Sequence, residues 1–359
     1  MSFIVFACSE VIDLGINQEG GQIVIYGRIT NGTQGNEVTV SRTAELGQAP
    51  EGVSNAIVKI IDESGIEELL IESASEPGKY ILERNTLQGT VGTAYRLEAE
   101  VDGRIYRTEL QSMPEIIGED ELDWELVEET EVSDQGVAFS QFVVKVYGST
   151  RFDRLPDEFY VRWGIEEAYT VLGMPLPLNR FPRYSPIQCY ITNDLSEQEA
   201  LLLDGSKIRT NNLQRQLLAT RLVDRSFKVK HYFNLIHTAI NRETHEYWSQ
   251  VNDIAAREGS IFDTPPAPVK GNIISDDTEE EVLGFFEVVA VDTARTFLTN
   301  NDIRVFFFDP CDLVGEDRLP LFRVPRECVQ CIIDEKIVDE TCIFCNRIPN
   351  SSLTRPSYF

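Results

Sequence analysis

The chain has 359 residues, of which 42% are hydrophobic and 25% are charged, a globular composition that excludes disordered, collagen-like and coiled-coil proteins. Its length suggests about two domains, and it contains no run of about 18 apolar residues that would predict a membrane-spanning helix. The formal net charge of −27 argues against nucleic-acid binding, because nucleic-acid binders neutralise phosphates with clustered Lys and Arg.

The first eight residues form a short apolar run that ends in Ala7-Cys8. A lipoprotein signal peptidase cuts before a cysteine in this setting, so we predict that residues 1–8 are the remnant of a signal and that Cys8 is lipidated. A short strand with a buried cysteine is the alternative. Because a basic region and a longer apolar region are missing, we expect a start codon further upstream or a trimmed chain. Acyl chains on Cys8 would anchor the protein to a membrane.

Residues 9–113 are predicted to form a small antiparallel β-sandwich. Alternating polar and apolar residues over 22–43 indicate two strands joined at Asn31-Gly32, and short strand-like runs separated by Asp and Gly follow over 53–103. The Ala-x-Val-x-Ile, Gly-x-Tyr and Tyr-x-Leu patterns of this segment resemble transthyretin-like or immunoglobulin-like modules of bacterial surface proteins.

Residues 114–135 are strongly acidic, with no Lys or Arg. Like charges keep such a segment solvated, while the alternation of Leu122, Trp124 and Leu126 with acidic residues also fits an edge strand. The sequence therefore predicts a linker or an edge strand. Calcium binding is an alternative, although the ligand spacing of an EF-hand is absent. The acidic residues are Glu119, Asp120, Glu121, Asp123, Glu125, Glu128, Glu129, Glu131 and Asp134.

Residues 136–312 are predicted to form a larger β-rich domain with one or two helices. A helix over 242–257 is indicated by Asn241 as its N-cap and Gly259 as its stop. A second helix or helical turn is predicted over 196–203, because Ser196 and Glu199 fit a capping box. The predicted strands are 137–147, 158–165, 229–239, 283–291 and 304–308.

A cysteine-rich tail over 313–359 ends the chain. Setting Cys8 aside leaves six of the seven cysteines, which could close as three disulfides in an oxidising compartment with a connectivity that the sequence leaves open. Two Cys-x-x-Cys pairs ten residues apart could instead hold a zinc ion, but export favours disulfides. The disulfide candidates are Cys189, Cys311, Cys328, Cys331, Cys342 and Cys345.

Several segments beyond residue 229 resemble one known family. The helix with Trp248, the Gly-Ser-x-Phe-Asp and Gly-Asn motifs and the Leu-Gly-Phe-Phe strand, together with Cys8 and the N-terminal sandwich, resemble a Bacteroidota outer-membrane lipoprotein family labelled only as a domain of unknown function. The resemblance implies a lipid-anchored protein of the outer membrane that faces the cell exterior and accompanies a TonB-dependent transporter. The residues of the family motif are Trp248, Gly259, Phe262, Asp263, Gly271, Asn272, Gly284 and Phe285.

No catalytic constellation is visible in the sequence, so we expect no enzyme, no metal and no cofactor. His231, His237 and His245 could hold a metal in principle, but we expect them to be packed or hydrogen-bonded core residues. Trp248 is expected to pack the helix on its sheet rather than to contact a ligand. The leading hypothesis is a transporter accessory that captures or gates cargo. The alternative is a free-standing surface protein that binds a glycan, a peptide or a cation.

Overall fold

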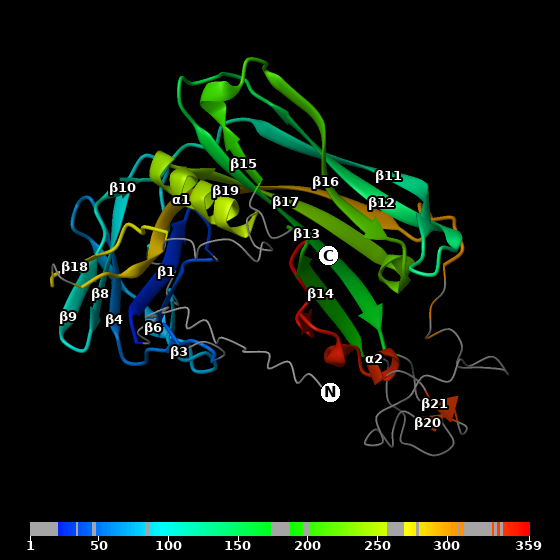
Figure 1. The fold of residues 1–359 in the computed structure, drawn as a ribbon, viewed down its shortest axis with the longest axis horizontal. Coiled ribbons are helices and arrows are strands. Elements are labelled where there is room, and N and C mark those ends of the chain that lie inside the picture. Colours follow the sequence, from blue (N-terminus) through cyan, green and yellow to red (C-terminus); the bar gives the residue numbers. More distant parts are fainter. Residues whose placement is uncertain are drawn as a thin grey trace, which may run out of the picture.

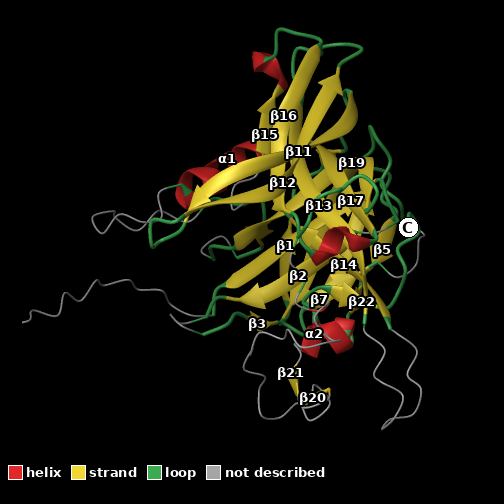
Figure 2. Ribbon diagram, turned by 90° about the vertical axis from the view of Figure 1, so that its right-hand side faces the viewer, coloured by secondary structure: helices red, strands yellow, loops and turns green. Residues whose placement is uncertain are grey.

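The computed structural model is mainly β, and strands dominate the view in Figure 2. The fold class predicted from the alternating sequence is confirmed. None of the helices in the described part of the chain has the length and hydropathy needed to cross a membrane. The structure describes residues 21–33, 35–44, 48–82, 87–173, 187–196, 201–256, 269–277, 280–307, 309, 311, 332–333, 336–337 and 340–359.

The largest sheet has eleven strands in the order β22-β14-β13-β17-β19-β1-β2-β7-β6, with β15 paired to β13 and β3 paired to β2. It runs from the strands near the N-terminus to those that hold the C-terminus (Figure 1). Its strands are β1 (Ile23–Thr30), β2 (Glu37–Arg42), β3 (Glu51–Gly52), β6 (Ile71–Glu72), β7 (Lys79–Ile81), β13 (Tyr160–Leu172), β14 (Gln188–Asp194), β15 (Leu201–Asp204), β17 (Lys230–Ile240), β19 (Leu283–Thr299) and β22 (Ser351–Ser352).

A six-stranded sheet packs against one end of the large sheet and forms a sandwich with it. Buried residues of both sheets, among them Ile25, Val38 and Phe286 from the large sheet and Val58 and Leu97 from the smaller one, share one hydrophobic core. Alternation of buried and exposed residues along β1 and β8 places these side chains on the inner faces. The six strands are β4 (Ile57–Asp62), β5 (Glu67–Leu69), β8 (Ala94–Val101), β9 (Arg104–Arg107), β10 (Gln111–Ser112) and β18 (Ile274–Ser275).

The sandwich includes strands that come from late in the sequence. Strand β19 pairs in parallel with β1 and antiparallel with β17, and β18 pairs with β9. The hydrogen bonds that complete the sandwich therefore cross the boundary predicted at residue 113. Strand β19 thus contributes buried residues both to the core of the sandwich and to the core beneath the three-stranded sheet.

A three-stranded sheet covers the other end of the large sheet. Val144 and Trp124 of this sheet pack with Phe233 and Leu298 of the large one. The acidic segment is an edge strand, β11, which pairs with β12 alone among the described strands. Leu122, Trp124 and Leu126 of β11 are partly buried against the large sheet, while the acidic residues between them are exposed, which is the alternation of an edge strand. The strands are β11 (Glu119–Val132), β12 (Ala138–Arg151) and β16 (Asn212–Leu222), and a separate pair is formed by β20 (Ile332–Ile333) and β21 (Lys336–Ile337).

Helical elements connect these sheets. The predicted N-cap of helix α1 is confirmed. Asn241 Oδ1 accepts a hydrogen bond of 2.8 Å from the Thr244 N–H, which satisfies a free donor of the first turn. The predicted stop, Gly259, lies outside the described residues. The helical elements are α1 (Arg242–Ala255), α2 (Glu340–Ile343), η1 (Gly205–Lys207), η2 (Arg225–Lys228) and η5 (Cys345–Arg347).

Two local predictions are wrong where the structure describes them. Residues 201–203 belong to strand β15 rather than to a helix, because they pair with β13, and long-range pairing overrides a local capping pattern. The hydroxyl of Ser196 instead accepts a hydrogen bond from the Ile165 N–H. Residues 304–307 are not a strand: Asp302 accepts a hydrogen bond from the Thr299 N–H and turns the chain at the end of β19.

Candidate functional site

Gly271, Asn272 and Gly284 of the predicted family motif hold one loop against the large sheet. A Cβ atom on Gly271 would lie 1.8 Å from the carbonyl oxygen of Gly284, and Gly284 itself has a φ of +101°. Asn272 acts as a substitute for a strand partner, since its side chain donates to the Phe286 carbonyl and accepts from the Phe286 N–H. These residues therefore serve close backbone packing.

Trp248 and Phe285, two further motif residues, lie on the two sides of the contact between helix α1 and strand β19. The ring of Tyr247 stacks on Phe285 at 4.4 Å, and the Trp248 Nε1–H donates to the carboxylate of Glu287. The expectation that Trp248 packs the helix on its sheet is confirmed. Gly259, Phe262 and Asp263, the remaining motif residues, lie outside the described residues.

The carboxylate under α1 also forms a buried ion pair. Arg162 on β13 donates two hydrogen bonds of 2.7 and 2.8 Å to Glu287 on β19, and its guanidinium lies 4.7 Å from the centre of the Trp248 ring. The Glu287 side chain is only 1% exposed. Burial, with a smaller contribution from Glu287, raises the pKa of Tyr26, which packs edge-on against Trp248. We call Arg162, Glu287 and Trp248 the helix-side cluster.

A second buried cluster lies on the opposite face of β13, under the three-stranded sheet. Glu167 accepts hydrogen bonds from Asn193 (2.7 Å) and Arg221 (2.5 Å), and His231 Nε2 lies 3.1 Å from its carboxylate. Burial alone would raise the pKa of Glu167, but His231 and Arg221 together lower it to about 2. The carboxylate is therefore ionised at neutral pH. We call Glu167, Arg221 and His231 the sheet-side cluster.

The three histidines are packed or hydrogen-bonded residues, as expected. The ring of His231 stacks on Phe227 at 4.1 Å, His237 Nδ1 lies 2.5 Å from Asp120 Oδ2, and the ring of His245 lies 4.7 Å from that of Tyr160. Burial lowers the pKa of His245. Within the described ranges no group of three or more His, Cys, Asp or Glu side chains converges as a metal site.

Four of the six disulfide candidates form two disulfides. Cys189 pairs with Cys345, and Cys311 pairs with Cys342. The alternative of a zinc site with all four tail cysteines as ligands is therefore wrong, because Cys345 is bonded to Cys189 and Cys342 to Cys311. Cys8, Cys328 and Cys331 lie outside the described residues.

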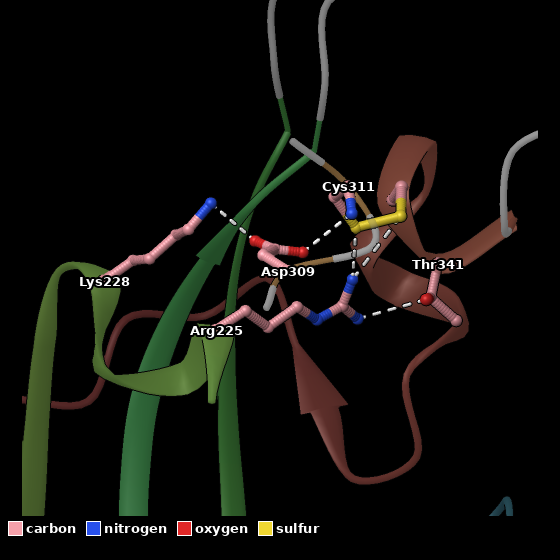
Figure 3. Close-up of a disulfide and its surroundings, with 6 residues drawn as sticks. Arg225, Lys228, Asp309, Cys311 and Thr341 are labelled. Carbon is pink, nitrogen blue, oxygen red and sulfur yellow. Dashed lines mark hydrogen bonds and ion pairs between the residues drawn. A yellow bond between two sulfur atoms is a disulfide. The ribbon is translucent and has the colours of Figure 1, made fainter. Parts of the chain in front are cut away.

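The Cys311–Cys342 disulfide lies in a charged environment (Figure 3). Arg225 Nη1 lies 2.7 Å from Cys311 Sγ and 3.7 Å from Cys342 Sγ, and its Nη2 donates to Thr341 Oγ1. Beside them, the buried carboxylate of Asp309 forms an ion pair of 2.5 Å with the ammonium group of Lys228. The disulfide thus joins the tail to the segment that follows strand β19, and the guanidinium of Arg225 joins the tail to helix η2.

A pocket of about 350 Å³ opens beside the corner between β17 and α1. Its apolar floor includes the buried residues Ile117, Phe159 and Ile240. Its rim carries an exposed ion pair of 2.6 Å between Glu158 and Arg242, and hydrogen bonds from Arg242 lower the pKa of Glu158. An apolar floor with a few polar groups at the rim is the usual composition of a small-ligand pocket.

The sequence interpretation did not single out the charged residues of these clusters. Two positions in the sequence do indicate a buried charge: Arg162 follows Val161 in a strand, and Glu287 interrupts the apolar run from Phe285 to Val289. A charge inside a buried strand needs a partner. The partners come from other strands, however, so the sequence alone could not have paired them.

Comparison with known proteins gives one match. The model of a domain of unknown function, DUF4249, matches residues 9–295. No curated protein and no solved structure matches the chain.

Proposed function

We propose that this chain, which belongs to the DUF4249 family of unknown function, is an exported accessory subunit of a TonB-dependent outer-membrane transporter. In this proposal the protein is anchored to the outer membrane by acyl chains on Cys8 and faces the cell exterior. It helps to capture the cargo of the transporter or to gate its entry, and it has no catalytic role.

The observation that carries the proposal of export is the pair of disulfides. Cys189–Cys345 and Cys311–Cys342 join positions that are 156 and 31 residues apart in the sequence. Structural disulfides persist in oxidising compartments such as the periplasm and the cell surface and are rare in the cytosol. The cysteines of the tail are therefore consistent with a protein that folds after export.

The two buried carboxylates hold the fold together and are not placed to reach a substrate. Glu287 and Glu167 are each 1% exposed and are bonded to Arg162 and Arg221, respectively. Catalytic acids and bases need access to a substrate, whereas these carboxylates join strands and a helix to one another. A lipid anchor would add a physical advantage, because confinement to a membrane raises the effective concentration of the protein beside a partner.

Affinity purification from native membranes tests the proposal. The tagged, lipidated, full-length protein is extracted from outer membranes in mild detergent, and the bound proteins are identified by mass spectrometry. We expect stoichiometric recovery of a TonB-dependent barrel. The matched control is Cys8→Ser, which should leave the membrane fraction and lose the barrel. Recovery of the wild-type lipoprotein alone would contradict the accessory role, and membrane attachment of Cys8→Ser would contradict the anchor.

The pocket beside α1 favours a second candidate, a free-standing surface protein that binds a glycan, a peptide or a cation. Its volume of about 350 Å³ lies within the usual range for small-ligand sites. This candidate predicts saturable binding by the purified protein without any barrel. A glycan, peptide and cation screen that gives no saturable binding would count against it, as would binding that is unchanged when Ile117→Trp fills the pocket.

A further inference from the structure

The two disulfides of this protein have different surroundings. Cys189 and Cys345 are fully buried and belong to an apolar cluster with Val171 and Ile191. In the other disulfide, Cys342 is 2% exposed, while Cys311 is only half-buried. A thiol in solution can therefore approach Cys311 more easily than any of the other three sulfurs.

A guanidinium group contacts both sulfurs of the more accessible disulfide. Arg225 Nη1 lies 2.7 Å from Cys311 Sγ and 3.7 Å from Cys342 Sγ, and Figure 3 draws these contacts as dashed lines. A disulfide sulfur is a weak hydrogen-bond acceptor, but a thiolate beside a guanidinium is strongly stabilised. Arg225 therefore favours the products of reduction more than it favours the disulfide.

The neighbouring charges leave the effect of Arg225 in place. The carboxylate of Asp309 accepts a hydrogen bond from the Cys311 N–H and would disfavour a thiolate. Its charge is compensated by Lys228, whose ammonium lies 2.5 Å away. The net charge of Arg225, Lys228 and Asp309 around the disulfide is thus positive, which lowers the pKa of a leaving thiol.

We propose that Cys311–Cys342 is a thiol–disulfide exchange site whose co-reactant is a dithiol. One thiolate of the dithiol attacks Cys311 Sγ, the bond to Cys342 Sγ breaks, and its electron pair stays on Cys342 as a thiolate beside Arg225. The second thiol of the dithiol then attacks the mixed disulfide and releases Cys311. Two electrons pass to the cysteines and the dithiol becomes a disulfide; one of its protons goes to solvent when the attacking thiol ionises, and the other goes to Cys311, while Cys342 stays a thiolate.

Reduction at this site would leave the other crosslink closed. Cys189–Cys345 lies in an apolar environment, where a thiolate is disfavoured, so its reduction requires a stronger reductant. The site would therefore separate residue 311 from residue 342 while Cys345 stays joined to strand β14. The inference does not depend on a transporter partner, and its test uses the purified protein alone.

Redox equilibration of the purified full-length protein tests the proposal. The protein is incubated with mixtures of reduced and oxidised dithiothreitol, free thiols are alkylated, and peptide mass spectrometry gives the reduced fraction of each pair. We expect Cys311–Cys342 to be half-reduced at a ratio of reduced to oxidised dithiol at least about tenfold lower than Cys189–Cys345 requires. Equal ratios, or the reverse order, would overturn the proposal.

Substitution of Arg225 tests the cause of the difference. Arg225→Gln should raise the ratio needed to reduce Cys311–Cys342 by about tenfold and leave Cys189–Cys345 unchanged, whereas Arg225→Lys should keep part of the effect. The matched control is Arg304→Gln, because Arg304 is exposed and its guanidinium donates to the Asn301 carbonyl. An Arg225→Gln protein that matches the wild type would overturn the assigned role. If Arg225→Gln does not fold, the order of reduction in the wild type and in Arg225→Lys still decides.

Discussion

The helix-side and sheet-side clusters use the same chemistry on opposite faces of one strand. Arg162 and Glu167 lie five positions apart on β13, so their side chains point to opposite faces. The helix-side cluster holds α1 on the large sheet through Glu287, and the sheet-side cluster holds the three-stranded sheet through Arg221. Strand β13 thus joins helix α1 and the three-stranded sheet to the large sheet by buried charges on both of its faces.

The two clusters differ in how completely water is excluded. The Arg162 side chain is 15% exposed and forms a two-point contact with Glu287, whereas the Arg221 side chain is 24% exposed and Glu167 has further partners in Asn193 and His231. A buried charge that loses its only ionic partner is more costly than one that keeps access to water. We therefore expect the helix-side cluster to be the more sensitive to substitution.

The largest effect is expected for Glu287→Gln. Loss of the carboxylate leaves the guanidinium of Arg162 buried without a counter-charge, and the free energy of unfolding should fall by about 3–5 kcal/mol. Urea denaturation measures the loss. The control is the double variant Arg162→Met with Glu287→Leu, in which neither charge remains and much of the stability should return. A loss below about 1 kcal/mol for Glu287→Gln would show that water reaches the pair.

Glu167→Gln should have the next largest effect. The His231 and Arg221 contacts lower the pKa of Glu167 from 4.5 to about 2, which corresponds to a loss of about 3 kcal/mol in the free energy of unfolding when the charge is removed at neutral pH. The same urea experiment checks it. Asn193→Ala is a useful comparison, because it removes one hydrogen bond and keeps the charge pair. Equal losses in the two variants would contradict an ionic origin.

The pH dependence of stability distinguishes Glu167 further. Because its pKa is lower in the folded protein than the ordinary 4.5, its contribution is fully present above about pH 4.5 and is lost as the pH falls towards 2. The difference between wild type and Glu167→Gln should therefore shrink over this range. Denaturant titrations at several pH values measure it, and a difference that stays constant down to pH 2 would contradict a lowered pKa of Glu167.

The smallest effect is expected for Trp248→Phe. Phenylalanine keeps an aromatic ring between α1 and the sheet but removes the N–H that donates to Glu287, so the loss should be about 1–2 kcal/mol. The ion pair with Arg162 remains in this variant. Thermal unfolding followed by circular dichroism gives the value. If the loss matched that of Glu287→Gln, the indole rather than the ion pair would carry the stability of the helix-side cluster.

The parts of the fold that the sequence predicted are those that depend on neighbouring residues. The helix that begins after Asn241 and the edge strand around Trp124 each follow from a local pattern of caps or alternation. The strand β15 at Leu201–Asp204 was mistaken for a helical turn, because its pairing with β13 is contributed by distant residues.

The candidate sites depended on long-range geometry and were predicted only in part. Four cysteines were correctly expected to form disulfides, but the pairing of Cys189 with Cys345 could not be derived from their spacing. The role of Glu287 could not be predicted, because its partner Arg162 is distant in the sequence. The two residues lie close together only because β13, β17 and β19 are neighbours in the sheet. Residue type thus indicated that disulfides form, but neither which cysteines pair nor which charges do.

The measurement that tests the accessory role most directly is crosslinking mass spectrometry on intact cells that produce the native protein. An amine-reactive crosslinker will reach exposed lysines such as Lys207, whose side chain is 79% exposed. An accessory subunit should give crosslinks between this chain and a TonB-dependent barrel. Abundant crosslinks within the chain, with none to any barrel, would contradict it.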